Sequence, residues 1–361
     1  MKQKRLIIFM PVIEGGGVEK NLFIISNYLK DKINEVSLVT ISKNFKNRFD
    51  KKIKLVSPKY KFWENLGRKK KFVVSLYLLF LEIIKNRKAV VLSFQANVYC
   101  VILCKLLGIK IIVRPNSSPE GWSQNIFKSF CFKYILGLAD KIIVNSIDLK
   151  NKFKSKFDLN SICIYNPLNK KEIIKKSKIK TNINISKKKI NLINVGRLVD
   201  QKDQITLLKS LNKIKNKINF NLLIVGRGEK KKYLLNYIYK NNLSKFVKII
   251  NYKNNPYNLI KKSDIFLLSS KYEGLPNVLL EAQVLKTYII SSNCPTGPRE
   301  ILMNGKAGSL YKIGDYISLS NLIIDFIKRR KNYKKKILLG YKNLFRFDYK
   351  KNLEKYLNEI N

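Results

Sequence analysis

Short apolar runs alternate with helix-like segments along almost the whole chain, and this alternation restricts the possible folds most. Apolar runs such as Leu6–Met10, Val36–Ile41 and Ala89–Phe94 are separated by segments with apolar residues at helical spacing. Buried strands connected by helices are typical of βαβ units, which build a parallel sheet covered on both faces. We therefore expect an α/β protein with doubly wound, Rossmann-like sheets.

The alternation lapses once, at 171–189, where Lys, Asn, Ser and Ile dominate. We interpret this polar stretch as a linker. It would separate an N-terminal Rossmann-like domain at 1–170 from a C-terminal one at 190–335. Residues 336–361 would form a basic helix that crosses back to the first domain. Ligands of doubly wound sheets bind at the carboxyl ends of strands, so the expected site faces a central cleft between the domains.

The 361 residues include no histidine, which excludes imidazole-based catalytic triads and histidine zinc sites. The net charge is +49, from 73 Lys and Arg against 24 Asp and Glu, and 62 of the 73 are lysines. Base readout relies mainly on Arg, so nucleic-acid binding is disfavoured relative to a solvated lysine-rich surface. Attraction to an anionic membrane surface stays open as an alternative.

Cysteine content and hydropathy indicate a protein of the reducing cytoplasm. The five cysteines include no Cys-x-x-Cys pair, and Cys100 and Cys104 are interpreted as small core residues. The first apolar run is too short for a signal peptide, and no stretch is long enough to span a membrane. The segment Phe72–Ile84 has basic residues at both ends. It either covers the first sheet or rests an apolar face on a membrane.

Two loops contain glycine where a phosphate could approach. Gly15–Gly17 links the first predicted strand to a helix, whose amino terminus favours an anion. Gly196 and Arg197 follow a strand of the second domain, and Lys202 lies five residues after Arg197. These two cations could clamp a diphosphate.

The strongest motif is the segment 273–282, which follows a predicted buried strand. Glu273 would lie in the loop, Pro276 and Asn277 would begin a helix, and Glu281 would lie one turn into it. The two carboxylates would then meet one ligand at different depths, and carboxylates suit the vicinal hydroxyls of a sugar. A rigid loop at 294–301, with Gly297 and Glu300, follows the next strand.

The four motifs together resemble the family 4 glycosyltransferases, retaining enzymes of the two-domain GT-B fold. The order and spacing of the glycine turn, the Gly-Arg…Lys loop, the Glu-x7-Glu segment and the Gly-Pro-Arg-Glu-Ile loop carry this resemblance. It covers nearly the whole chain. The Glu-x7-Glu segment with its Gly-x-Pro core is the most specific part.

The resemblance implies roles for individual residues. Arg197 and Lys202 would neutralise the diphosphate, Glu281 would bind the ribose, and Glu273 would hold the donor sugar, so that Glu273, Arg197 and Lys202 form the catalytic set. Many members have a histidine in the first domain; here Arg114 or Asn116 would take over contacts on the acceptor side. Gly16 and Gly17, counted with the donor site, would approach the donor diphosphate or the acceptor. The other residues implied in donor binding are Gly196, Gly226, Gly274, Leu275, Pro276, Asn277 and Val278.

The expected reaction moves a hexose or N-acetylhexosamine, with retention, from a nucleoside-diphosphate sugar to a glycan or polyprenyl-linked saccharide in bacterial surface polysaccharide synthesis. No Asp-x-Asp occurs, so we expect no metal and no resident cofactor. The protein would be cytoplasmic or peripheral at the inner membrane face. A sugar-nucleotide epimerase of the same fold and a basic nucleic-acid-binding protein are the alternatives. The nucleotide, sugar, acceptor, linkage and oligomeric state stay open.

Overall fold

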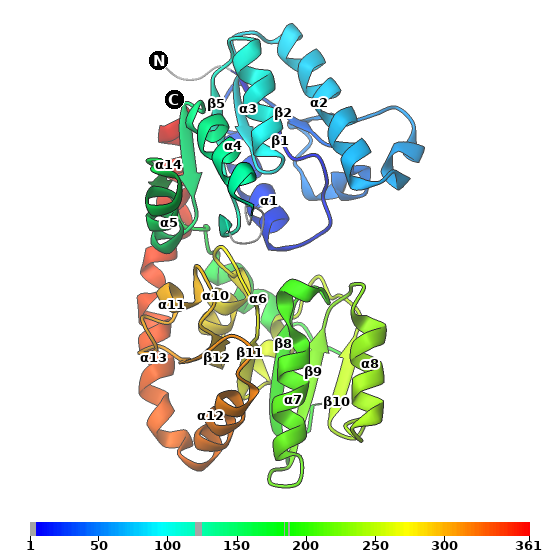
Figure 1. Cartoon of the computed structure of the whole chain (residues 1–361), viewed down its shortest axis with the longest axis vertical. Helices are drawn as coiled ribbons and strands as arrows, with labels where there is room; N and C mark the ends of the chain where they lie inside the picture. The colour runs from blue at the N-terminus through cyan, green and yellow to red at the C-terminus, as the bar shows by residue number, and fades with distance from the viewer. Residues whose placement is uncertain (1–4, 120–124, 184, 187) are drawn as a thin grey trace. The chain divides into compact units, whose positions relative to one another are not determined.

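The computed structural model describes residues 5–119, 125–183, 185–186 and 188–361. The chain divides into two compact units, one of residues 1–167 with 349–361 and the other of residues 168–348 (Figure 1). Each unit is built around its own parallel sheet. Two Rossmann-like α/β units are therefore present, as the alternation predicts.

The sheet of unit 1 has seven strands in its described part, in the order β3-β2-β1-β4-β5-β6-β7. The interior strand β1 pairs in parallel with both β2 and β4. The strands are β1 Arg5–Phe9, β2 Glu35–Val39, β3 Lys54–Val56, β4 Val90–Ser93, β5 Ile111–Val113, β6 Lys141–Val144 and β7 Ile162–Cys163. The helices are α1 Gly17–Leu29, α2 Arg68–Lys85, α3 Asn97–Leu106, α4 Ile126–Gly137, α5 Ile147–Phe157 and α14 Tyr349–Ile360, with 3-10 turns at Lys43–Arg48 and Lys61–Asn65.

The sheet of unit 2 has six strands in the described residues, in the order β10-β9-β8-β11-β12-β13. They are β8 Ile190–Val195, β9 Phe220–Val225, β10 Val247–Ile250, β11 Ile265–Leu268, β12 Tyr288–Ser292 and β13 Ser309–Tyr311. The helices are α6 Lys170–Ser177, α7 Gln204–Ile214, α8 Lys231–Lys240, α9 Tyr257–Lys261, α10 Asn277–Val284, α11 Pro298–Ile301, α12 Tyr316–Lys328 and α13 Lys334–Lys342. Short 3-10 turns lie at Asp200–Lys202, Arg330–Tyr333 and Asn343–Phe347.

The core of unit 1 shows why its strands are mostly apolar. Ile8 and Leu92 pack on one face, in a cluster with α1 and α14, whereas Ile7 and Val91 pack on the other face with α2 and α3. Successive side chains of a strand point to opposite faces, so a strand covered on both sides buries every residue. Cys100 and Cys104 lie in this core with no exposed surface, which confirms their interpretation as small core residues.

The expected linker at 171–189 differs from the structure in its first part, where α6 forms. The Asn169 side chain accepts a hydrogen bond from the Glu172 backbone at 3.0 Å and caps the helix. Glu172 pairs with Lys176 one turn later, and Ile173 is buried. Unit 2 therefore begins at residue 168 rather than 190. The sequence pattern does not show this helix, because a short helix with one apolar face resembles a polar linker in composition.

The expected helix at 336–361 is also divided. α13 ends at Lys342, a 3-10 turn follows, and the extended backbone of Asp348 (φ −52°, ψ 133°) separates them from α14. Residues 349–361 belong to unit 1, where Leu353, Tyr356 and Ile360 enter the core. The basic composition is continuous across Asp348, so the sequence pattern does not show this break.

Removing one buried side chain from the sheet should destabilise unit 1. Leu92 in β4 has no exposed surface, so Leu92→Ala should lower the free energy of unfolding by about 2–5 kcal/mol. Leu106, which is 80% exposed on α3, is the control: Leu106→Ala should change it by less than about 0.5 kcal/mol. Urea denaturation measures both, and equal losses would contradict this packing.

Candidate active site

The centre of the candidate site is an ion pair between two residues far apart in sequence. Lys202 Nζ donates to Glu273 Oε1 at 2.5 Å, and the two side chains are only 16% and 9% exposed. Lys202 ends the short turn after β8, and Glu273 lies in the loop between β11 and α10. β8 and β11 are neighbours in a parallel sheet, so both loops leave the same edge. The structure thus brings together two residues predicted from separate motifs.

Backbone hydrogen bonds hold this pair in place. The Ser269 hydroxyl donates to the carbonyl of Lys202 at 2.8 Å, and the Gln201 amide donates to the carbonyl of Tyr272 at 2.8 Å. The Lys271 backbone N–H donates to the carbonyl of Gln201, also at 2.8 Å. The loops of β8 and β11 are therefore joined as one rigid unit around the lysine.

Glycines allow the loops of the site to approach closely. The aliphatic part of Lys202 passes over Gly196, where an added Cβ would lie 3.8 Å from it. A Cβ on Gly226, after β9, would lie 1.9 Å from the Gly196 carbonyl oxygen. Gly228 has φ +155°, and a Cβ there would lie 2.3 Å from the Leu198 carbonyl oxygen. Only glycine fits at 226 and 228, because each loop rests on the backbone of another.

The loop after β12 supports Glu273 from its other side. The Thr296 hydroxyl donates to the Glu273 carbonyl at 2.7 Å, and the Glu273 backbone N–H donates to the Pro295 carbonyl at 3.0 Å. Gly297 has φ +89° and lies so close to Gly274 that an added Cβ would approach its oxygen to 2.3 Å. The rigid loop predicted at 294–301 therefore acts as a support for the loop that carries Glu273.

The α10 amino terminus lies beside this carboxylate. Pro276 is the N-cap residue, and no side chain makes a capping hydrogen bond there. Helix amino termini carry partial positive charge and free N–H groups, which suit a phosphate. Glu281 lies on the same helix and is 5% exposed. The helix α10 thus begins at Asn277 after the N-cap Pro276, as predicted, and Leu275 lies in the loop just before it.

Charges in the site are close and poorly solvated. Burial, together with the neighbouring Glu273 carboxylate, raises the pKa of the Cys294 thiol to about 12. The thiol therefore stays neutral at physiological pH and is not a nucleophile. Asp203 follows Lys202, and burial raises the pKa of its carboxyl group. The Gln204 amide donates to the Arg197 carbonyl at 2.9 Å and fixes the backbone that carries this second cation.

In unit 1 the glycine turn already contains a carboxylate. Glu19 is 8% exposed, and its Oε1 accepts a hydrogen bond from the Glu14 backbone at 3.3 Å. A Cβ on Gly16 would lie 2.9 Å from the other carboxylate oxygen. This acid occupies the amino-terminal turn of α1, next to Gly16 and Gly17. The Glu19 carboxylate would repel a phosphate there, so of the two expected ligands, the donor diphosphate and the acceptor, the turn better suits the hydroxyl groups of an acceptor.

The expectation that Arg114 contacts an acceptor sugar needs correction. Arg114 has no exposed surface. Its guanidinium donates to Tyr356 Oη at 2.6 Å, to Asn166 Oδ1 at 2.7 Å and to Asn116 Oδ1. The Asn116 amide in turn donates to the Phe94 carbonyl at 2.7 Å. Arg114 is thus a positioning residue that fixes Asn116 after β5.

Several supporting residues carry no recognisable motif. Thr296, Ser269 and Gln204 bond to backbone carbonyls of loops distant in sequence, and Asn166 and Tyr356 complete the Arg114 network. Thr296 could have been suspected, since it lies inside the rigid loop already singled out. Tyr356 could not, because its contact with Arg114 depends on the return of α14 to unit 1.

Comparison with known proteins points to the class of protein that has this fold and site. Residues 175–342 match the family model of the glycosyl transferases group 1, and they make up most of unit 2. The structure of HepE from Anabaena in complex with UDP-glucose superposes with a TM-score of 0.79 over 98% of both chains, at 16% identity. Unit 2 is therefore similar to the group 1 glycosyltransferases over the matched residues, and the chain as a whole has the GT-B fold.

Curated relatives agree with this assignment. The amylovoran biosynthesis glycosyltransferase AmsD of Erwinia amylovora is 26% identical over 91% of this chain and 92% of its own length. An N-acetylgalactosaminyltransferase of Campylobacter jejuni, named for a diphospho-undecaprenol-linked acceptor, is 26% identical over 66% and 67%. The uncharacterized glycosyltransferase MJ1059 of Methanocaldococcus jannaschii is 34% identical over 52% of this chain, which spans about half of that relative (48%). These findings favour glycosyl transfer over the epimerase and nucleic-acid alternatives.

Substituting Gly226 tests the packing of the site loops. Gly226→Ala should lower the stability of unit 2 by about 1–3 kcal/mol, because the new methyl group would overlap the Gly196 carbonyl. Gly67, before α2, is the matched control, since nothing lies within 4 Å of its added Cβ. Gly67→Ala should leave the melting temperature almost unchanged. Equal melting temperatures for both variants would contradict the close approach.

Proposed function

We propose that the chain transfers a hexose or N-acetylhexosamine from a nucleoside-diphosphate sugar, with retention of anomeric configuration, as a family 4 glycosyltransferase. The acceptor is a glycan or polyprenyl-linked saccharide of bacterial surface polysaccharide synthesis. The observation that carries this proposal is the Lys202–Glu273 pair beside the uncapped amino terminus of α10. A cation and helix N–H groups suit a diphosphate, and a carboxylate suits sugar hydroxyls.

The donor binds to unit 2 in this proposal. Glu281 accepts hydrogen bonds from the ribose hydroxyls, and the loops that carry Gly196 and Gly226, packed on one another, lie against the nucleotide. Arg197 and Lys202 lie on the diphosphate with the start of α10. Glu273 holds the sugar hydroxyls near the reacting carbon. Because Lys202 is paired with Glu273 without donor, the arriving diphosphate must share this lysine with the carboxylate.

Bond cleavage places negative charge on the departing diphosphate and positive charge on the sugar. Arg197, Lys202 and the α10 amino terminus stabilise the phosphate charge, an effect worth about 2.7–4 kcal/mol per well-placed donor. The departing phosphate takes the proton from the acceptor hydroxyl, which suits a chain without histidine. Arg197 and Lys202 supply the positive charge that a metal ion would otherwise supply to the diphosphate, so we propose transfer without metal or resident cofactor.

The acceptor belongs to unit 1 in this proposal. The Gly16–Gly17 turn, with its Glu19 carboxylate, and Asn116, held by Arg114, offer hydrogen-bond partners for hydroxyl groups. The Campylobacter relative is named for a diphospho-undecaprenol-linked acceptor, which supports a lipid-linked substrate. Among the described residues no helix is both long and apolar enough to cross a bilayer. We therefore propose peripheral attachment at the inner membrane face and no role for nucleic acid.

The diphosphate clamp predicts a selective loss of activity. Lys202→Ala should reduce kcat/KM by about 100- to 1000-fold, since one transition-state donor is removed. Lys271→Ala is the control: Lys271 adjoins the same loop but pairs with the exposed Asp200 at 2.7 Å. Its activity should stay within about twofold of the unchanged protein. Radiolabelled sugar transfer measures kcat/KM for both variants. A Lys202→Ala variant with unchanged kcat/KM would rule out the diphosphate clamp.

Substitutions of Glu273 and Glu281 should have opposite effects on nucleotide binding. Glu273→Gln should bind free UDP or GDP more tightly while losing transfer, because the Lys202 charge is no longer neutralised. Glu281→Ala should abolish the thermal shift by the same nucleotide, since the ribose contact is lost. A nucleotide at 100 times its Kd raises stability by about 2.7 kcal/mol, which a melting curve resolves. Unchanged nucleotide affinity in both variants would show that the donor site is misplaced.

A further inference from the structure

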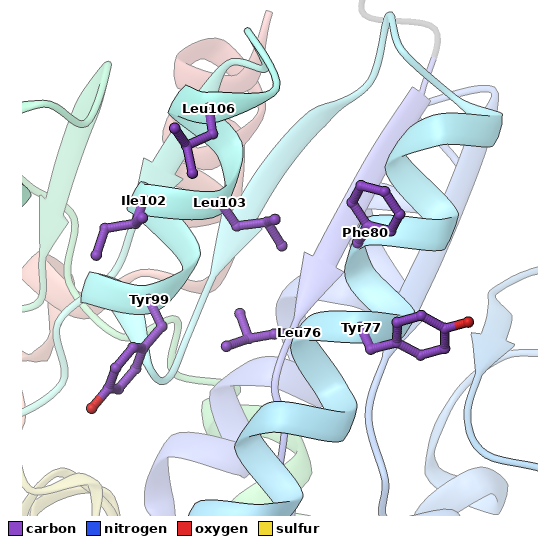
Figure 2. A pocket seen from close by; sticks show the side chains of 7 residues that line it. All are labelled: Leu76, Tyr77, Phe80, Tyr99, Ile102, Leu103 and Leu106. Atoms are coloured by element: carbon purple, nitrogen blue, oxygen red, sulfur yellow. The ribbon is translucent and has the colours of Figure 1, made fainter.

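Unit 1 has an exposed apolar groove between α2 and α3. Seven residues line its volume of 340 Å³, all aliphatic or aromatic: Leu76, Tyr77, Phe80, Tyr99, Ile102, Leu103 and Leu106. Figure 2 shows Leu76 of α2 and Leu103 of α3 pointing toward one another, whereas Tyr77 points away from α3. Leu106 is 80% exposed, Tyr77 61% and Tyr99 56%. The helices thus bury one face against the sheet and leave a second apolar face uncovered.

The apolar surface continues onto α4, which contacts α3. Phe130 and Tyr134 are 58% and 56% exposed, with ring centroids 4.3 Å apart, and Leu138 just after the helix is 57% exposed. We call the exposed apolar side chains of α2, α3 and α4, with Leu138, the α2–α4 face. Contiguous apolar surface of this kind marks an interaction site rather than ordinary exposed residues.

The charges around the α2–α4 face are predominantly basic; the acid Asp140, two residues after Leu138, is paired with Lys105 of α3 at 2.8 Å. Arg68, Lys69 and Lys70 are exposed at the start of α2, and Lys85 and Arg87 are exposed at its end. The acid of α2, Glu82, is 3% exposed and pairs with Lys54 at 3.0 Å. The sequence of α3 contains no acid. A second copy of this chain would therefore bring like charges together, whereas a surface of anionic headgroups would neutralise them.

The exposed tyrosine side chains of the α2–α4 face suit the boundary between lipid hydrocarbon and headgroups. Tyr77, Tyr99 and Tyr134 expose a ring with a hydroxyl group, next to the aliphatic Ile102 and Leu106. Tyrosine is enriched where hydrocarbon meets headgroups, because its ring is apolar and its hydroxyl remains hydrated. A basic helix with an apolar face lies in this interface. The residue types of the α2–α4 face therefore match a bilayer surface.

The face also reaches the end of the sheet where an acceptor would bind. Helix α2 leads into the amino end of β4, so in a βαβ unit its first turn lies toward the carboxyl ends of the strands. Tyr99 lies in the first turn of α3, directly after β4. The basic start of α2 and Tyr99 thus share that end of unit 1 with Asn116, which follows β5.

We propose that the α2–α4 face docks unit 1 on an anionic lipid bilayer. The apolar and aromatic side chains enter the headgroup region, and the basic residues at both ends of α2 contact anionic headgroups. Docking would present the carboxyl edge of the sheet to a lipid-linked acceptor; this clause rests on the proposed function, but docking itself requires neither donor nor acceptor.

Co-sedimentation of the full chain with phosphatidylglycerol-containing and pure phosphatidylcholine vesicles tests the proposal. Lys69→Gln with Lys70→Gln should weaken binding to the anionic vesicles about 30-fold, at about 1 kcal/mol per charge. Lys232→Gln with Lys240→Gln, exposed on α8, removes the same charge and should have little effect. Leu106→Ser should weaken binding about tenfold, whereas Tyr239→Ser, equally 80% exposed on α8, should not.

Each result of the vesicle experiment either supports or overturns docking of the α2–α4 face on an anionic bilayer. Equal losses from the α2 and α8 lysine pairs would overturn the proposal, because attraction would then follow net charge alone. Equal binding to both vesicle types would overturn it too. A dimer in sedimentation equilibrium that Leu106→Ser dissociates would assign the face to a second copy. The assay contains no donor, so nucleotide melting curves test the transferase proposal separately.

Discussion

Burial of each parallel sheet on both faces is the constraint on which the rest of the structure depends. The strands are therefore mostly apolar on both faces, as Ile7, Ile8, Val91 and Leu92 show. Most charged groups lie outside the strands, and in parallel sheets the loops after the strands gather at one edge. Lys202 and Glu273 meet because β8 and β11 are neighbours, although 71 residues separate them.

The site of unit 2 depends on backbone contacts as much as on its charged side chains. Gly226 and Gly297 let loops touch that any larger residue would separate. Thr296 and Ser269 then fix the carbonyls of Glu273 and Lys202. The preorganised pair of Lys202 and Glu273 offers both a cation for phosphate and a carboxylate for hydroxyls. The contacts that hold these loops together therefore also hold Lys202 and Glu273 in place for the proposed chemistry.

In unit 1 the buried cation of Arg114 is hydrogen-bonded to neutral groups, whereas Lys202 in unit 2 is paired with a carboxylate. Arg114 is completely buried, and its hydrogen bonds go to neutral groups, Tyr356, Asn166 and Asn116. Burial of the cation is tolerated because these oxygens replace water. Most other basic residues remain at the surface, where those around α2 flank an apolar face. The high net charge is thus general background, with a local use only where apolar side chains accompany it.

The sequence alone determined the α/β class, the two Rossmann-like units and the segment that contains Glu273 and Glu281, because strand burial and loop glycines leave periodic, local signals. It did not determine that α6 replaces the first part of a polar linker, that Asp348 divides the last helix, or that Arg114 is buried. Those features depend on contacts between distant segments, such as Tyr356 with Arg114. Tertiary structure decided them because a side chain's exposure depends on which segment packs over it.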